Sequence, residues 1–176
     1  MIFHHTGHRG TQRFGFTVVT LLILAASLWA SVEDPKKADK VLVFKHNREL
    51  QLLSKGKVFK SYKIALGGEP LGPKVQQGDH KTPEGFYLLD RRNPKSQFHR
   101  ALHVSYPNGN DRERARKQGV APGGDIMLHG LPNGYGAIGA AHRLKDWTDG
   151  CIAVTNEEIE EIWKLVPNGT PIEIRP

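Results

Sequence analysis

Short apolar stretches separated by turn residues run along the chain from residue 41 to its C-terminus. Short runs rich in β-branched and aromatic side chains, bounded by Gly, Pro or Asn, are typical of strands. We expect strands over residues 41–46, 49–54, 57–66, 84–90, 100–105, 125–129, 151–155 and 171–174. The 19 Gly and 11 Pro add to the turn signals. The pattern therefore predicts a mainly β fold rather than a helix bundle.

One helix is marked clearly near the C-terminus. Thr155 and Glu158 have the spacing of a capping box, in which the first residue caps the helix and the second bonds back to it. An apolar face follows at helical spacing, made by Ile159, Ile162, Trp163 and Val166. The charged stretch 111–118 predicts a second, exposed helix that ends at Gly119. We therefore expect one or two short helices beside the strands.

The N-terminal part has a different pattern. Residues 14–30 contain no charged side chain, and Arg9 and Arg13 precede them. A basic segment followed by an apolar one is typical of a secretory signal peptide, and an uncleaved membrane anchor is the alternative. Both interpretations predict export to the periplasm or cell wall. We divide the chain into a signal peptide or anchor at 1–30, a linker at 31–40 and one domain at 41–175.

Composition narrows the class of protein. The 176 residues are 38% hydrophobic and 24% charged, which is typical of a globular domain and argues against extensive disorder or a polytopic membrane protein. The formal net charge is +7. For an exported chain this charge favours polyanionic wall polymers over nucleic acid, and the sequence has no basic run interleaved with aromatic residues. The single Cys excludes an intrachain disulfide and any zinc site built on two thiolates.

That cysteine has neighbours suited to nucleophilic chemistry. Cys151 opens an apolar run directly after Gly150, so its sulfur is expected at a strand end beside backbone N–H groups that can bind an oxyanion. His129 ends another apolar run and is followed by Gly130. An imidazole next to a thiol can take its proton and generate the thiolate nucleophile. If the two strands are neighbours, the sequence predicts a cysteine–histidine pair at one edge of the sheet.

Several motifs together resemble one family, the L,D-transpeptidase (YkuD-type) catalytic domain. The first set is Gly67-Gly68, Gly78-Asp79 and the stretch KTPEGFY at 81–87. The second is His129-Gly130 followed by DWTDGCIAVTN at 146–156, and the resemblance extends over nearly all of residues 41–174. It implies a sandwich- or barrel-like β domain and cysteine acyl transfer without metal or other cofactor.

The resemblance also implies roles for individual residues. Cys151 falls on the family's nucleophile, and His129 falls on its proton acceptor and donor. Gly130 falls on the residue whose backbone carbonyl orients the histidine, and the N–H groups of Gly150 and Cys151 fall on the oxyanion site. The chain departs from the usual motif in having Asp149 where the family has His, and Ala153 where Arg or Asn is frequent. His129 precedes Cys151 by 22 residues, which is longer than the commonest spacing.

Four further residues are candidates for substrate contacts. His142 and Arg143 lie in the insertion between His129 and Cys151, and Trp147 and Asp149 lie in the cysteine motif. His142 is also an alternative base, and Trp147 is either a groove wall or a core residue. A metal site made by His129, His142 and Asp149 has the right residue types but matches no standard zinc spacing, so we assign no metal.

These observations favour an exported cysteine acyltransferase that acts on peptidoglycan stem peptides. An amine from a second stem would turn the thioester into a cross-link, and water would hydrolyse it, so an L,D-carboxypeptidase or amidase is the alternative enzyme. In the amidase interpretation, wall-attached protein is a further partner, which the enzyme releases from the wall. A wall-binding domain without catalysis is the alternative outside the enzymes, and Asp149 keeps it open. Membrane contact is expected only through an N-terminal anchor.

Overall fold

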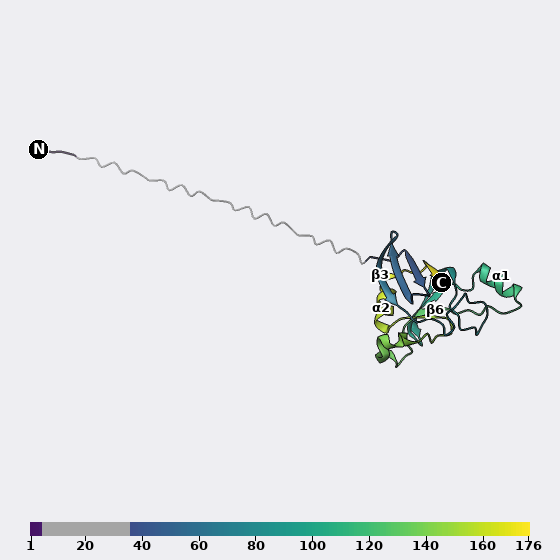
Figure 1. The fold of residues 1–176 in the computed structure, drawn as a ribbon. Helices are drawn as coiled ribbons and strands as arrows, with labels where there is room; N and C mark the ends of the chain where they lie inside the picture. The colour runs from purple at the N-terminus through teal and green to yellow at the C-terminus, as the bar shows by residue number, and fades with distance from the viewer. Residues whose placement is uncertain (5–35) are drawn as a thin grey trace. The chain divides into compact units, whose positions relative to one another are not determined.

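The computed structural model describes residues 1–4 and 36–176, and the second range holds every helix and strand discussed here (Figure 1). Eight strands, two α-helices and one 3₁₀ helix follow one another within this range. In chain order they are β1 (Lys40–Phe44), β2 (Glu49–Ser54), β3 (Lys57–Lys63), β4 (Gly85–Ser96), β5 (His99–Val104), α1 (Gly109–Lys117), β6 (Met127–His129), η1 (Gly136–Leu144), β7 (Ile152–Ala153), α2 (Asn156–Leu165) and β8 (Thr170–Arg175). The prediction of a mainly β domain is confirmed.

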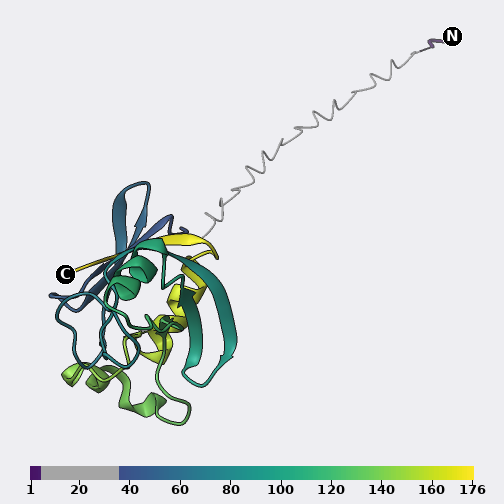
Figure 2. The ribbon, with the colours of Figure 1, turned by 90° about the vertical axis from the view of Figure 1, so that its right-hand side faces the viewer.

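All eight strands belong to one mixed sheet with the order β3-β2-β1-β8-β4-β5-β6-β7. The hairpins are antiparallel, whereas β1–β8 and β6–β7 are parallel pairs. The chain leaving β3 then bends to the far edge, where Ala65 and Ala153 exchange two backbone hydrogen bonds of 2.9 Å. The sheet therefore curls until its two edges meet, as in a barrel, and the long β4–β5 hairpin curves along one side (Figure 2).

The concave side of the sheet is filled by aliphatic side chains. α2 packs against β5, and its Ile159 and Ile162 are fully buried. Thr155 and Glu158 make both hydrogen bonds of the expected capping box, so the predicted helix begins where the motif places it. The largest fully buried side chains are Leu50, Leu52, Ile64, Leu66, Leu89, Leu102, Leu128, Leu131, Ile152, Ile159, Ile162 and Ile172.

The long loop between β3 and β4 is fastened by buried lysines. Lys45 is almost completely buried and donates from Nζ to the Thr82 carbonyl at 3.0 Å and to the Glu84 carboxylate at 2.7 Å. Lys74 is buried in a similar way and pairs with Asp79 at 2.7 Å. A buried charge is tolerated only with such partners. The Lys45 contacts tie the loop to the end of β1, and the Lys74–Asp79 pair links two parts of the loop to each other.

The structure differs from the predicted elements at several strand ends and in one additional helix. β1 ends at Phe44 rather than residue 46, because Lys45 turns inward to its partners, and β3 ends at Lys63 because the chain bends toward Ala153. β4 extends to Ser96, well past residue 90, because the backbone of its second half pairs with β5, whereas its mostly exposed polar side chains give no apolar pattern. The 3₁₀ helix η1 is a third short helix that the sequence pattern did not indicate.

The predictions for the N-terminal part fall largely outside the described residues. The predicted signal peptide or anchor at 1–30 and the first half of the linker at 31–40 lie mostly in residues 5–35, which the structure does not describe. Among the residues that it does describe, no helix has the length and apolarity that a membrane crossing requires.

Candidate active site

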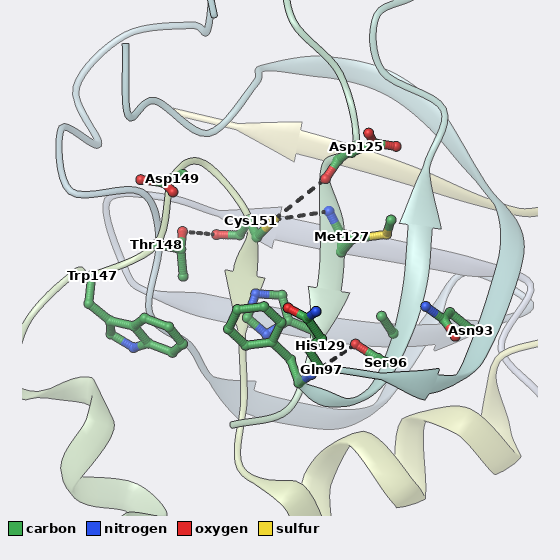
Figure 3. Close-up of a pocket in the computed structure, with 12 residues that line it drawn as sticks. Asn93, Ser96, Gln97, Asp125, Met127, His129, Trp147, Thr148, Asp149 and Cys151 are labelled. Carbon is green, nitrogen blue, oxygen red and sulfur yellow. Dashed lines mark hydrogen bonds between the residues drawn. The ribbon is translucent and has the colours of Figure 1, made fainter. Parts of the chain in front are cut away.

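A cavity of about 420 Å³ opens at the end of the sheet where β6 and β7 begin (Figure 3). Cys151 and His129 both line it, so the structure brings together the two residues on which the sequence prediction depends. Trp147 and Asp149, predicted as substrate contacts, also line it. The full lining consists of Asn93, Ser96, Gln97, Phe98, Ala101, Asp125, Met127, His129, Trp147, Thr148, Asp149 and Cys151.

Strand pairing explains why the thiol and the imidazole meet. β6 and β7 are parallel neighbours, with His129 opposite Ala153, so Cys151 lies two residues before the partner of His129. Residues two apart on a strand share a face, and both side chains therefore project from the same face of adjacent strands. The Cys151 Sγ lies 3.4 Å from the Met127 N–H nitrogen and 3.7 Å from the Asp125 carbonyl oxygen. The sulfur is thus held at the strand edge by weak contacts only.

The turn that presents Cys151 requires a glycine at position 150. Gly150 has φ = 120°, which side-chain-bearing residues rarely adopt. A Cβ there would lie 2.5 Å from the Lys81 carbonyl oxygen, well inside van der Waals contact. The close approach packs the turn before Cys151 against the loop that the buried lysines hold.

Replacing Gly150 with Ala is therefore expected to destabilise the protein. Backbone strain and the contact with Lys81 together should lower the free energy of unfolding by about 2–4 kcal/mol. Gly68→Ala is the matched control, because a Cβ at Gly68 meets nothing within 4 Å, and it should change stability by less than about 0.5 kcal/mol. Urea unfolding of the two variants measures the difference. Equal midpoints for Gly150→Ala and wild type would contradict the assignment.

His129 is fixed in one tautomer by the residue that follows it. Its Nδ1 donates to the Gly130 carbonyl oxygen at 2.6 Å, so Nδ1 carries the proton and Nε2 keeps its lone pair. Phe98 packs on the imidazole with ring centroids 4.5 Å apart, and Trp147 meets it edge-on at 5.9 Å. The geometry at Gly130 is the one that the resemblance implies, and it leaves Nε2 as the base.

The resting pair is a neutral thiol and a neutral imidazole. Burial lowers the pKa of His129 to about 4, although its hydrogen bond to the Gly130 carbonyl acts in the opposite direction. Burial also raises the pKa of the Cys151 thiol; the Met127 N–H opposes this rise, and the Asp149 carboxylate adds to it. Both shifts disfavour a thiolate–imidazolium ion pair. Proton transfer is therefore expected to accompany attack on the substrate.

The low pKa of His129 has a consequence for stability. The unfolded histidine binds a proton near pH 6.5 and the folded one only near pH 4, so unfolding takes up a proton between these values and stability falls as the pH falls. Through His129 alone, the free energy of unfolding should fall by about 3 kcal/mol between pH 7 and pH 4. Urea unfolding at several pH values should show a weaker pH dependence in His129→Gln than in wild type. Parallel curves for the two proteins would exclude the shifted pKa.

The backbone donors near the sulfur are not equivalent. The Gly150 N–H donates to Thr148 Oγ1 at 3.2 Å, and the Thr148 hydroxyl donates to the Cys151 carbonyl at 2.7 Å. The Cys151 N–H makes no hydrogen bond within residues 36–176. Of the two oxyanion donors that the resemblance implies, Cys151 is available directly, and Gly150 would have to exchange the Thr148 hydroxyl for the substrate.

Two of the residues predicted as substrate contacts lie outside the cavity that Cys151 lines. His142 is buried outside this cavity, where its Nδ1 accepts the Trp147 Nε1–H at 3.4 Å, and it lines a separate apolar cavity of about 230 Å³. Arg143 pairs with Glu158 and so ties η1 to α2. Both are placed to support η1 and Trp147 rather than to touch a substrate at Cys151. Ala153 is fully buried, so the frequent Arg or Asn of the family would not fit there unchanged.

The cavity wall that faces Cys151 was not predicted from the sequence. Asn93, Ser96, Gln97 and Phe98 come from the β4–β5 hairpin, which bends over the cavity (Figure 3). Their stretch contains Pro94 and charged residues and has neither apolar alternation nor a motif, so only strand pairing could have located it. Within the described residues, no group of three or more His, Cys, Asp or Glu side chains has the arrangement of a metal site.

Comparison with known proteins gives a consistent result. The chain is 35% identical over 133 residues to YafK of Escherichia coli K12, a candidate L,D-transpeptidase; the match covers 72% of the chain and 46% of YafK. Among solved structures, the helical cell shape determining protein Pgp2 from Campylobacter jejuni matches with a TM-score of 0.59 and 31% identity, over 77% of this chain and 46% of Pgp2. Bd1075 of Bdellovibrio bacteriovorus matches with a TM-score of 0.53 and 28% identity, over 76% and 46%. The chain thus spans about half the length of these relatives.

The family model described as the L,D-transpeptidase catalytic domain, YkuD, matches residues 38–174. This range includes the curled sheet, the loop held by Lys45, and both Cys151 and His129. The resemblance drawn from the motifs is thereby confirmed, and the chain belongs to the L,D-transpeptidase (YkuD) catalytic domain family.

Proposed function

We propose that this chain is an exported cysteine acyltransferase that acts on peptidoglycan stem peptides through a thioester on Cys151. The observation that carries the proposal is the placement of a thiol and a tautomer-fixed imidazole in one cavity, on adjacent parallel strands. A nucleophile beside a base that a third group orients is the arrangement of nucleophilic catalysis. Membership of the L,D-transpeptidase family supports the choice of substrate.

The reaction then proceeds in two halves. Nε2 of His129 takes the proton of the Cys151 thiol as the sulfur attacks the carbonyl of an L,D-configured peptide bond. The Cys151 N–H stabilises the negative oxygen that forms, and His129 returns the proton to the leaving amine. A thioester remains, and an amine or a water molecule resolves it to a new amide or an acid. The product depends on which of these two acceptors reaches the thioester.

Transfer and hydrolysis can be separated by their products. Purified full-length chain is incubated with a disaccharide tetrapeptide, with and without a second stem peptide that offers an amine, and the muropeptides are resolved by chromatography and mass. A cross-linked dimer supports the transpeptidase, and a trimmed stem alone supports the carboxypeptidase or amidase. Binding of peptidoglycan without either product would favour a wall-binding domain and contradict the proposal.

Export and a role in cell shape are part of the same proposal. The apolar run 14–30 behind Arg9 and Arg13 supports export to the periplasm or wall, either as a cleaved signal or as an anchor. The similar protein Pgp2 is described as determining helical cell shape, which makes wall remodelling the expected biological role. Cell fractionation with mass analysis of the mature N-terminus tests export, and a full-length cytoplasmic chain would contradict it.

A further inference from the structure

An ion pair joins the β1–β2 turn to the segment that precedes the nucleophile. Nε and Nη2 of Arg48 both donate to Asp146 Oδ2, at 2.9 and 2.7 Å, across 98 residues of chain. Arg48 lies between β1 and β2, and Asp146 directly precedes Trp147, which lines the same cavity as Cys151. A guanidinium that meets a carboxylate through two N–H groups fixes the geometry as well as the charge of the pair.

Both partners of this ion pair are also held by the backbone. The Arg48 N–H donates to the Lys45 carbonyl at 3.2 Å, and the Arg48 carbonyl accepts the Ile64 N–H at 3.0 Å. The second carboxylate oxygen of Asp146, Oδ1, accepts the Leu66 N–H at 2.9 Å. The side chains of Arg48 and Asp146 are 36% and 16% exposed. An isolated surface ion pair contributes little, but a partly buried pair with two-point geometry and a further backbone donor fixes the position of its segment.

Leu66 transmits this constraint to the wall of the catalytic cavity. Its N–H is bound by Asp146, and its carbonyl accepts the N–H groups of Trp147 and Thr148, each at 3.1 Å. The Thr148 carbonyl in turn accepts the Gly68 N–H at 3.0 Å. Leu66 itself is fully buried. The main chain of Trp147 is therefore fixed by a buried backbone segment and by the carboxylate that precedes it.

The Trp147 ring connects this segment to the proposed base. It meets the His129 imidazole edge-on, with ring centroids 5.9 Å apart, and its Nε1–H donates to His142 Nδ1 at 3.4 Å. Burial of His129 lowers its pKa to about 4, and Phe98 and Trp147 both pack on its ring. Water that reached the imidazole past a displaced indole would weaken this effect, because desolvation of the charged form is its cause. The position of Trp147 thus bears on the aim of the base and on its affinity for protons.

We propose that Asp146, held by Arg48, is a positioning residue for acyl transfer, which fixes the segment that places Trp147 against His129. The inference rests on the proposed function, because the ion pair performs no chemistry of its own. Neither Arg48 nor Asp146 lines the cavity, so both act through Trp147 and not on the substrate. The pair gives a role to Asp146, the first residue of the cysteine motif.

The test uses the full-length chain with three substitutions. Asp146→Asn keeps the shape of the side chain but removes the charge that Arg48 binds, and Arg48→Lys keeps the charge but loses the two-point contact. Glu173→Gln is the matched control, because Glu173 pairs with Lys40 at 2.6 Å between β8 and β1, with side chains 10% and 37% exposed. Glu173 also pairs with Arg175 at 2.6 Å, so the control removes at least as many charged contacts. Urea unfolding shows that each variant folds and compares their stabilities.

Acylation by a disaccharide tetrapeptide, followed by intact mass, is the first readout. At neutral pH its rate should fall by about 10- to 100-fold in Asp146→Asn and by about 3- to 10-fold in Arg48→Lys, because a displaced wall misaligns the base. The pH below which acylation fails should rise from about 4 toward 6.5, the ordinary pKa of histidine. Glu173→Gln should keep the wild-type rate and pH profile. All three variants leave Asp125 and Asp149, the carboxylates that line the cavity, in place.

Hydrogen exchange of the Trp147 indole N–H is the second readout and needs no substrate. The NMR signal of this group is assigned by its loss in Trp147→Phe. Asp146→Asn should speed its exchange by at least about tenfold, because the hydrogen bond to His142 opens more often when the segment is released. Glu173→Gln should leave the exchange rate unchanged.

Three results would overturn the inference. They are a wild-type rate and pH profile in Asp146→Asn, equal slowing in Glu173→Gln, and slow acylation in Asp146→Asn with unchanged indole exchange. If Asp146→Asn does not fold, the same readouts in Arg48→Lys decide between the outcomes. Failure of wild type to acylate would instead contradict the proposed function, and the indole exchange would still test how Trp147 is positioned.

Discussion

Replacing Cys151 with Ser is expected to abolish turnover of stem peptides, with a loss of at least about 10⁴-fold. The hydroxyl is nearly isosteric with the thiol but far less acidic, and a histidine whose pKa is about 4 is too weak a base to activate it. Product formation from a disaccharide tetrapeptide, followed by chromatography, gives the rate.

The fold provides the control for this variant. Within the described residues, the hydrogen-bond contacts of the sulfur are the Met127 N–H at 3.4 Å and the Asp125 carbonyl at 3.7 Å, so its loss should change the free energy of unfolding by less than about 1 kcal/mol. Binding to insoluble peptidoglycan should also persist in Cys151→Ser. Turnover within tenfold of wild type by the folded variant would show that another residue is the nucleophile.

Replacing His129 with Gln is expected to slow acylation of Cys151 by about 10²–10⁴-fold, because His129 contributes the one imidazole among the residues that line the cavity. The pH dependence should change as well. In wild type the neutral imidazole is the active form, so acylation should fall only as the pH approaches about 4. In His129→Gln the rate depends on thiolate alone and should rise steadily with pH, since burial and Asp149 hold the thiol pKa above its ordinary value.

Acylation rates measured by mass between pH 4 and pH 9 test this expectation. His142→Gln is the matched control, because His142 is buried outside the catalytic cavity and contacts Trp147 instead. It should keep the wild-type pH profile, with at most a small loss through a displaced Trp147. A wild-type acid limb near pH 6.5 would mean that the histidine is not desolvated in the working enzyme, and a large loss in His142→Gln alone would make His142 the base.

Local sequence signals were sufficient to predict the elements whose limits are set by residues near in the chain. The Thr155–Glu158 capping box marks the start of α2, and the short apolar stretch 49–54 between turn residues marks β2. The ends of elements were harder, because long-range contacts decide them. β1 stops where Lys45 turns toward Glu84. β7 is reduced to Ile152–Ala153 because it lies between the turn that requires Gly150 and Thr155, the N-cap of α2.

The candidate site likewise has residues that a sequence motif indicates and residues that only the fold brings to it. Cys151, His129 and Gly130 stand in a motif, and parallel pairing of β6 and β7 brings them to one cavity, which a sequence can suggest but not establish. Phe98 reaches the site only through the β4–β5 hairpin, where it packs on His129. It lies in no apolar pattern and at no distinctive spacing, so no local signal could have assigned it to the site.

The proposed function depends on Cys151 carrying the acyl group. The most direct measurement is intact-mass analysis of the full-length chain after incubation with a disaccharide tetrapeptide, followed by peptide mapping, with Cys151→Ala in parallel. We expect a covalent adduct on wild type, located on the peptide that contains Cys151, and none on Cys151→Ala. The added mass should equal that of the donor minus the released C-terminal amino acid. An adduct that persists in Cys151→Ala, or product release by that variant, would contradict the role of Cys151.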